Sequence, residues 1–240
     1  MYPRTAQTPS PEGNLLLASL PRRTSGGLLS SFKTASFELG QVLYEPGEPV
    51  KYAVFPMTAM LSVIAEGDRG RSVEIAVVGS DGMAGLDALL GRQQESLYRV
   101  IVQLPGEALR LPLSAVHEAA ARPGPFQDAV NAYTSAFIVE TSRAAVCNAL
   151  HGIDQRLAKW ILRTQDHARS DRFQMRQDFM AKMLAERRPA ISEAAQKLRR
   201  NGVIDYQRGT LTVLDRRALE QTACACYQII RDAYAQLPVN

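Results

Sequence analysis

The chain has 240 residues, of which 46% are apolar and 22% charged, a globular composition that excludes fibrous, collagen-like and low-complexity proteins. Its formal net charge is +4. The longest uncharged apolar stretch, residues 53–65, is shorter than the roughly 18 residues of a bilayer-spanning helix, and the N-terminus lacks a secretory pattern. We therefore expect a cytoplasmic protein with no membrane contact.

The charge is unevenly distributed along the chain. Residues 172–217 hold eleven Lys and Arg against five Asp and Glu, a net charge of +6, whereas residues 28–120 hold seven against eleven, a net charge of −4. Such an asymmetry is expected when one region faces a polyanion and the other does not. The C-terminal part is therefore a candidate for binding nucleic acid.

The N-terminal half changes from a polar tail to a region of short strands. Residues 1–13 contain three prolines and no apolar periodicity, which predicts disorder, and the apolar residues between 15 and 32 predict one or two short helices. Between residues 37 and 111, apolar and polar residues alternate in short runs separated by Gly- and Pro-containing turns. Several short strands at this spacing predict an antiparallel sandwich or roll.

Beyond the strands the apolar period becomes helical, and nothing interrupts the helix before residues 151–152. A helix of this length suits a partner helix, so we expect its apolar stripe to form a dimer interface as well as to pack on the chain's own strands. A second helix is expected over residues 153–167. The members of the apolar stripe are Phe126, Val130, Tyr133 and Phe137.

The C-terminal third carries the most specific pattern. A short helix over residues 177–184 and a tight turn precede a second helix that begins at Pro189 and ends at residues 201–202. Residues 203–213 then form a compact hairpin. Two tightly joined helices followed by a two-stranded wing describe a winged helix-turn-helix, whose second helix reads DNA.

The second of these helices carries polar and basic side chains opposite its apolar stripe. N-terminal residues of such a helix reach base edges in the major groove, so Arg187, Arg188, Ser192 and Glu193 are expected to contact bases. Side chains farther along the helix and in the hairpin are expected to contact phosphates, which position a protein without reading sequence. The phosphate-contacting candidates are Lys197, Arg199, Arg200 and Arg208, and Gln196 shares their face.

The order of these parts resembles the Crp/Fnr family of bacterial transcription regulators, from about residue 15 to residue 227. The strongest matching segments are GQVLYEPGE at residues 40–48 and MLAERRPAIS at 183–192, the latter followed by NGVI at 201–204. The resemblance implies an α+β fold with an N-terminal antiparallel β-roll like that of cyclic-nucleotide-binding domains, a long dimerisation helix and a C-terminal winged helix-turn-helix. We expect a disordered tail over residues 1–13 and a sensor β-roll over residues 14–124. The dimerisation helix and the helix that follows it are expected over residues 125–167, and a DNA-binding domain over residues 168–240.

The same resemblance implies the partners. It predicts a homodimer on a two-fold-symmetric operator in double-stranded DNA, an unidentified small-molecule effector and contact with RNA polymerase. It implies no cofactor.

The sequence departs from this family where cyclic nucleotides bind. Members that bind them use a Glu preceded by Gly and an Arg about ten residues later, because a buried phosphate needs a charge-assisted donor. The matching loop contains Gly82 and Gly85, with Leu86 in place of the Glu. Ser96 stands at the Arg position, although a shift of three residues would place Arg99 there. We therefore expect an effector other than cyclic AMP.

The cysteines and histidines show no metal-site pattern. Cys147, Cys224 and Cys226 are odd in number and lack repeated paired spacing, so neither a disulfide nor a structural metal is expected. The iron–sulfur branch of the family uses a cluster of cysteines near the N-terminus, whereas the first cysteine of this chain is Cys147. The last two occupy a predicted terminal helix, where residues two apart point to different sides, and one thiol should be buried and inert. The three histidines, His151 among them, are scattered without a Cys or Glu ligand set.

No catalytic pattern accompanies these features, since the chain lacks Gly-x-Ser-x-Gly, a Walker loop and a dinucleotide fingerprint. Two other functional classes stay open. One is a β-roll small-molecule-binding module that acts through protein contacts. The other is a cupin-like enzyme, which is disfavoured because the strand region holds a single histidine, His117, at its very end.

Overall fold

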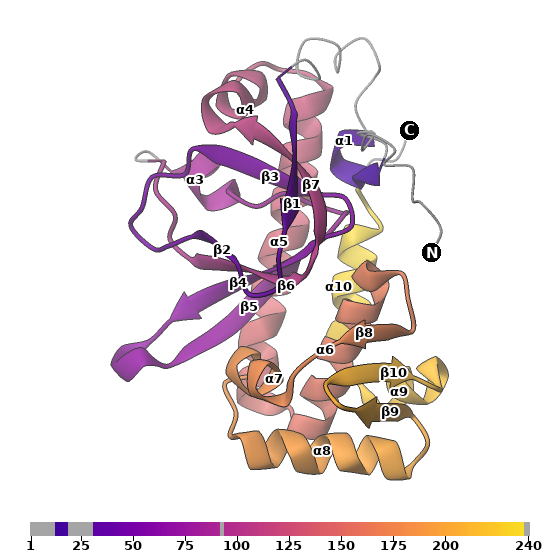
Figure 1. The fold of residues 1–240 in the computed structure, drawn as a ribbon. Helices are drawn as coiled ribbons and strands as arrows, with labels where there is room; N and C mark the ends of the chain where they lie inside the picture. Colours follow the sequence, from indigo (N-terminus) through magenta and orange to yellow (C-terminus); the bar gives the residue numbers. More distant parts are fainter. Residues whose placement is uncertain (1–12, 19–30, 92–93, 238–240) are drawn as a thin grey trace, which may run out of the picture.

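The structure is a computed structural model that describes residues 13–18, 31–91 and 94–237 (Figure 1). Within these ranges the chain begins with the short helix α1 (Leu15–Ala18) and continues into strands. Residues 1–12 and 19–30, which include most of the predicted tail and any second short helix, lie outside this description. No helix of the described residues is long and apolar enough to cross a bilayer.

Two antiparallel sheets form the predicted β-roll. One has the order β1 (Lys33–Phe37), β7 (Gly106–Pro112), β3 (Tyr52–Pro56). The other has the order β2 (Val42–Tyr44), β6 (Arg99–Leu104), β4 (Met60–Glu66), β5 (Ser72–Val78). The roll confirms the fold class predicted from the alternating apolar residues.

Strand β4 shows how the roll joins the rest of the molecule. Successive side chains of a strand point to opposite faces, and in β4 both faces are covered. Leu61 and Val63 pack in the core of the roll, whereas Met60 and Ile64 pack in a second core with the C-terminal domain. The two cores therefore meet on one strand.

The roll is closed by turns and short helices at the positions where Gly and Pro predicted reversals. The 3-10 helix η2 (Asp68–Gly70) forms the tip of the β4–β5 hairpin, and α3 (Leu86–Leu90) follows the next loop. In the turn after β2, Gly47 has a φ of +80° and the Glu48 amide donates to the Glu45 carbonyl at 3.1 Å. This left-handed conformation favours glycine. Helix α4 (Leu113–Ala120) ends the roll.

The long helix α5 (Pro125–Leu150) confirms the predicted uninterrupted helix, and three of the four residues of its apolar stripe are buried against the chain's own roll. Phe126, Val130 and Tyr133 are 3%, 3% and 0% exposed in the single chain, because they pack in the core of the roll. The Tyr133 hydroxyl donates to the carbonyl of Met83 at 2.9 Å. Phe137 packs on the same core and is half-buried. Helical periodicity therefore identified the buried face, and the predicted packing on the chain's own strands is confirmed.

The C-terminal domain follows helix α6 (Ile153–Ala168) and contains the predicted helix-turn-helix. Its two helices are α7 (Gln177–Met183) and α8 (Arg188–Arg200). The wing differs from the prediction by one strand. Besides β9 (Ile204–Gln207) and β10 (Thr210–Val213), the sheet contains β8 (Arg172–Gln174), which pairs with β10.

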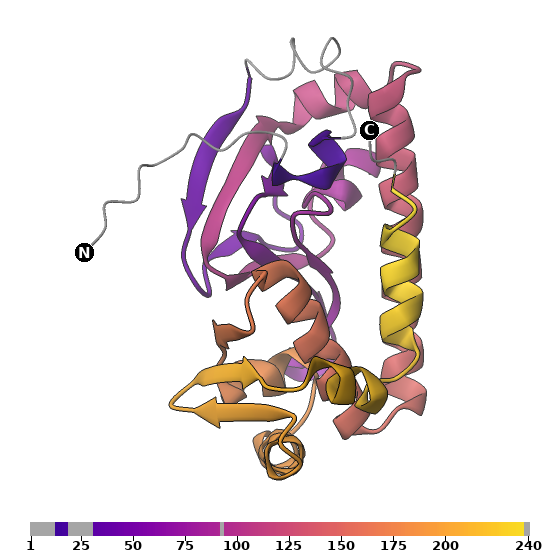
Figure 2. The ribbon, with the colours of Figure 1, turned by 90° about the vertical axis from the view of Figure 1, so that its right-hand side faces the viewer.

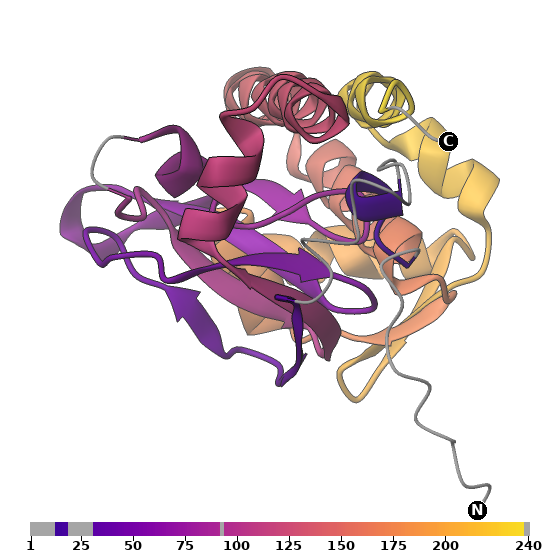
Figure 3. The ribbon, with the colours of Figure 1, turned by 90° about the horizontal axis from the view of Figure 1, so that it is seen from above.

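The chain ends with two helices rather than the predicted single one. Helix α9 (Arg216–Thr222) stops before Cys224, and α10 (Cys226–Tyr234) starts after it. Figures 2 and 3 show α10 running beside α5, away from α8 and the wing. Ile230 and Tyr234 of α10 pack in the core of the roll, so the last helix returns to the N-terminal domain.

Candidate nucleic-acid interface and effector region

Helix α8 lies across one end of the molecule (Figure 1). Its apolar side chains pack inward against the rest of the C-terminal domain. Ile191 and Leu198 are 0% and 3% exposed in the core of the C-terminal domain. The opposite face is open to solvent. Its exposed side chains are those of Arg187, Arg188, Glu193, Gln196, Lys197, Arg199 and Arg200.

Ser192 differs from the other predicted DNA-contacting residues of α8. Its side chain is half-buried, and its hydroxyl donates to the side-chain oxygen of Gln177 at 2.9 Å. This bond joins α8 to the first residue of α7. The hydroxyl oxygen of Ser192 keeps its acceptor capacity toward DNA.

A buried arginine of α6, Arg156, stabilises the turn between α7 and α8, and sequence reasoning missed it. Ala185 in this turn has a φ of +51°, and the Glu186 amide donates to the Ala181 carbonyl at 2.9 Å. Arg156 of α6 pairs with the Glu186 carboxylate at 2.8 Å and also donates to the Leu184 carbonyl. Its remaining bond reaches Asn148 of α5 at 2.9 Å. Arg156 therefore connects the DNA-binding turn to the long helix.

The tip of the wing presents Arg208 to solvent. Gln207 pairs with Thr210, so Arg208 and Gly209 form a two-residue loop with φ values of +50° and +80°. Positive φ at both central residues is the type I′ pattern that matches the twist of paired strands. The loop therefore holds the Arg208 side chain at the outermost point of the hairpin.

Two of the predicted phosphate contacts are ion-paired in the free chain. The Lys197 ammonium lies 2.5 Å from the Asp154 carboxylate of α6, and the Arg199 guanidinium lies 3.3 Å from that of Asp205 in the wing. Both cations are more than half exposed, so their pairs are weakened by water and salt. A phosphate must compete with these carboxylates.

The effector-pocket candidates lie where the chain's own side chains fill the roll. Leu86 is 5% exposed and packs in the core. Gly82 and Gly85 are close-packed, since a Cβ on Gly82 would lie 2.3 Å from the Tyr133 ring and one on Gly85 would lie 3.4 Å from Val50. The structure therefore brings these three residues together as packing positions.

A groove of about 400 Å³ lies outside α3, and the described residues that line it include two acids and no base. Asp87 is one of these acids, and it accepts hydrogen bonds from the Ser96 hydroxyl at 3.2 Å and from the Leu97 amide at 2.7 Å. Ser96 is the residue expected from the sequence at the Arg position of cyclic-nucleotide-binding proteins. A carboxylate at this place repels a phosphate rather than compensating its charge.

Arg99, the alternative phosphate ligand, is already paired. Its guanidinium lies 2.7 Å from the Glu45 carboxylate and 2.9 Å from that of Glu66. The hydrogen bond to Glu45 raises the pKa of Arg99 further above its usual range. The cation joins the turn after β2 to the end of β4.

A buried polar group connects the roll, α5, α6 and α10, and sequence reasoning missed it as well. Glu140 of α5 and Arg163 of α6 form an ion pair at 3.2 Å, with both side chains 6% exposed. The Tyr234 hydroxyl of α10 donates to Glu140 at 2.7 Å, and the Val77 amide of β5 donates to it at 3.4 Å. No periodic pattern links these four residues, so only the tertiary structure reveals them.

The expectation of scattered histidines and separated thiols is wrong. Cys147, Cys224 and Cys226 are all buried, and their sulfur atoms and a ring nitrogen of His151 all lie within 4.8 Å of one another. Cys224 and Cys226 point to one place because the chain changes direction between α9 and α10.

Comparisons with known proteins agree with this architecture. Residues 34–122 match the model of the cyclic nucleotide-binding domain, and residues 155–222 match that of the Crp-like helix-turn-helix domain. A search of curated proteins finds no match.

Solved structures with the same fold cover most of the chain. A protein of Eubacterium rectale assigned as a Crp/Fnr-family transcriptional regulator is 14% identical, with a TM-score of 0.68, covering 88% of this chain and 98% of its own. FixK2 from Bradyrhizobium japonicum is 14% identical, with a TM-score of 0.68, and covers 81% and 98%. A CRP/FNR-family transcriptional regulator from Thermus thermophilus is 21% identical, with a TM-score of 0.64, and covers 80% and 98%. At these identities the likeness shows the shared fold.

Proposed function

Because the chain belongs to the Crp/Fnr family of transcriptional regulators, we propose that it binds a two-fold-symmetric DNA operator as a homodimer and does so without cyclic AMP. Members of this family are regulators rather than enzymes. The observation that carries the proposal is the solvent-exposed basic face of α8 beside the wing. Contact with RNA polymerase stays a prediction.

In this proposal α8 enters the major groove, and its N-terminal residues read bases. Arg187, Arg188, Ser192 and Glu193 lie at that end, where Arg suits guanine and Glu suits the amino group of cytosine. Lys197, Arg199, Arg200 and the wing-tip Arg208 neutralise phosphates on either side of the groove.

The exposed face of α5 supplies the dimer interface in place of the buried stripe. Exposed positions recur along α5 at alternating intervals of three and four, which is the spacing of a two-stranded coiled coil. Ile138 is 58% exposed at the centre of this face. The Ser142 hydroxyl donates to the Ile138 carbonyl at 2.7 Å, so it can be buried without losing a partner. The positions of this seam are Ser135, Ile138, Ser142, Ala145 and Ala149.

The acidic groove and the filled roll support independence from cyclic nucleotides. Asp87 accepts a hydrogen bond from Ser96, the residue expected at the Arg position, so a phosphate there would meet a carboxylate in place of a cation. Arg99 is held by two carboxylates. We expect no heat of binding from cyclic AMP or cyclic GMP at roughly tens of micromolar, and no effect of either on DNA binding. Tight binding that Arg99→Ala abolishes would assign Arg99 to the phosphate instead.

Retention of duplex DNA tests the proposal. Affinity should fall steeply with salt because bound Lys and Arg displace counterions. Arg188→Ala should relax base preference at one position of each half-site by about 1–3 kcal/mol, whereas Arg208→Ala should weaken all sequences alike and reduce the salt slope by about 1. Arg122→Ala, which removes an exposed cation of the roll, is the matched control and should change neither.

Two results would contradict the proposal. Failure to retain any duplex would favour the β-roll module that acts through protein contacts. Equal effects of Arg188→Ala and Arg208→Ala on every sequence would show that α8 contacts only the phosphate backbone.

A further inference from the structure

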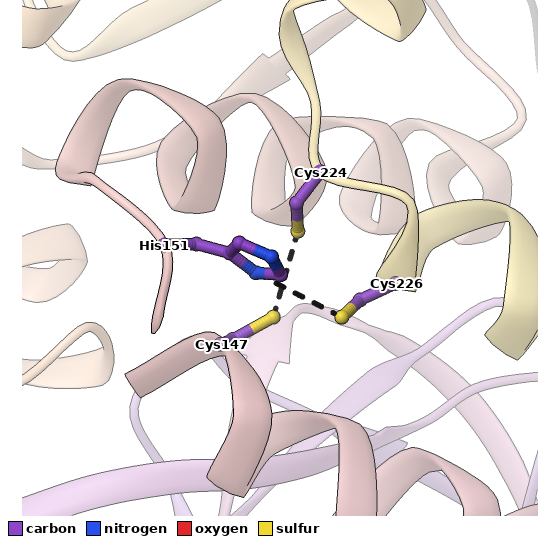
Figure 4. Close-up of side chains that lie close together, drawn as sticks. All are labelled: Cys147, His151, Cys224 and Cys226. Atoms are coloured by element: carbon purple, nitrogen blue, oxygen red, sulfur yellow. Dashed lines mark hydrogen bonds between the residues drawn. The ribbon is translucent and has the colours of Figure 1, made fainter. Parts of the chain in front are cut away.

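Three thiols and one imidazole converge at the corner where α5 ends and α10 begins (Figure 4). Cys147 and His151 come from the C-terminal end of α5, Cys224 from the link between α9 and α10, and Cys226 from the first residue of α10. The Cys147 and Cys224 sulfur atoms are 3.5 Å apart, and the Cys226 sulfur lies 3.9 Å from Nδ1 of His151. The two pairs form one cluster, because all four ligand atoms lie within 4.8 Å of one another.

Local structure explains the convergence. Residues four apart share one face of a helix, which places Cys147 and His151 together at the end of α5. Between Cys224 and Cys226 the chain enters α10, so two residues that would diverge on a continuous helix face the same point. Burial then separates all three thiols from water.

The spacing of these atoms matches a single tetrahedral ion. In a tetrahedron with zinc–sulfur bonds of about 2.3 Å and zinc–nitrogen bonds of about 2.0 Å, ligand atoms are roughly 3.5 to 3.8 Å apart. The sulfur–sulfur distance of 3.5 Å is about 0.3 Å below its edge and the sulfur–nitrogen distance of 3.9 Å is about 0.4 Å above its edge, and all four atoms lie within 4.8 Å of one another. Small rotations of the side chains would bring the four atoms onto one tetrahedron. An iron–sulfur cluster attaches its thiolates to different iron atoms and so requires a wider arrangement.

We propose that Cys147, His151, Cys224 and Cys226 bind one Zn²⁺ ion, which fastens the C-terminal helix to the end of the long helix. Three Cys and one His are a ligand set of structural zinc sites with no open position. Binding releases the three thiol protons, leaving three thiolates, a neutral imidazole and a complex of net charge −1. Lys159 of α6 interacts electrostatically with Cys147 and Cys226, and its ammonium offsets that charge.

The site lies beside the residues that connect the long helix to the helix-turn-helix. Cys147 and His151 lie on either side of Asn148, which accepts a hydrogen bond from Arg156, and His151 immediately precedes Gly152, the N-cap of α6. The ion would therefore fix α10 beside the same corner that carries the helix-turn-helix. The proposal stands apart from DNA binding, because its test measures metal on the protein.

The test uses the full chain, purified under reducing conditions, loaded with Zn²⁺ or Co²⁺ and dialysed against a weak chelator. We expect about one equivalent of zinc per chain, tetrahedral Co²⁺ bands with thiolate charge transfer, and a higher unfolding temperature with zinc. His151→Ala should lose the retained ion, and Cys224→Ser should lose the charge-transfer intensity of one thiolate. His117→Ala, an exposed histidine outside the cluster, is the control and should retain the ion.

Several outcomes would overturn the proposal. One is a wild-type chain that retains no zinc under these conditions, and another is metal retained equally by the wild-type and His151→Ala proteins. Iron together with acid-labile sulfide would instead show a cluster. A Cys147–Cys224 disulfide that forms in air with equal ease in the presence of excess zinc would show that the thiols serve a redox function.

Discussion

Glu140→Gln should destabilise the fold by more than one ordinary hydrogen bond contributes. The substitution keeps the shape of the side chain but leaves Arg163 charged at a site where its side chain is 6% exposed. Removing one partner of a buried ion pair costs roughly 3–5 kcal/mol. We expect the lower end, about 3 kcal/mol, since the amide oxygen can still accept from Tyr234 and the Tyr234 ring lies 5.1 Å from the guanidinium carbon.

The single tryptophan of the chain reports this change. Trp160 is 3% exposed and lies one helical turn before Arg163, so its fluorescence should follow urea unfolding of this junction. Protein concentration must be fixed, because a dimer's stability depends on it. Glu118→Gln provides the control: it breaks an exposed ion pair with Arg122 and should cost less than about 0.5 kcal/mol.

The double variant Glu140→Leu with Arg163→Met sharpens the test. With neither charge left in the core, the part of the loss that comes from the unpaired arginine should return, because apolar replacement of a buried pair is often neutral or better. The remaining loss is that of the Tyr234 hydroxyl and the Val77 amide, which donate to Glu140 in the wild-type protein. A loss below about 1 kcal/mol for Glu140→Gln would refute the reasoning, since Arg163 would then have found water or another anion.

Three further changes test other parts of the structure. Burial raises the pKa of Glu74 to about 7 from 4.5, so this group's contribution to stability is full below pH 4.5 and lost as pH rises through 7. Glu74→Gln should therefore add up to about 3 kcal/mol at pH 8 and little at pH 4.5, and an equal effect at both in urea titrations would contradict the assignment. Ala185→Gly should raise stability by roughly 0.5–1 kcal/mol in the same titrations, because Ala185 has a φ of +51°, and a loss would disprove that strain. Ile138→Asp should convert the proposed dimer to a monomer in sedimentation, whereas Leu97→Asp on the roll, at a side chain that is more exposed than Ile138, should not. A dimer that Ile138→Asp leaves unchanged would show that the interface lies elsewhere.

Local signals in the sequence predicted the fold well because each acts over a few residues. The alternation around Leu61 and Val63 and the turn signal before Pro189 need no knowledge of distant partners. The buried face of α5 was also predicted, but periodicity reports burial and not the identity of the partner. Tyr133 packs on its own roll, which the stripe by itself did not distinguish from contact with a second subunit.

The residues that sequence reasoning missed depend on contacts between distant segments. Cys147 and Cys224 are 77 positions apart, and Glu140 and Tyr234 are 94 apart. Spacing rules for metal sites address ligands on neighbouring turns, so they gave no signal for a cluster assembled from α5 and α10. A prediction of such sites requires the path of the chain after the wing, which no local pattern specifies.

The return of α10 to the long helix changes how the DNA-binding domain can move. A domain that is attached to the rest of a protein at one end only can rotate about a single hinge. Here the segment between α6 and α10 is anchored at entry by α6 and at exit by Ile230 and Tyr234 in the core of the roll. Met60 and Ile64 of β4 add a third attachment, because they pack in one core with the C-terminal domain. Any effector that reorients α8 must therefore loosen more than one of these attachments at once.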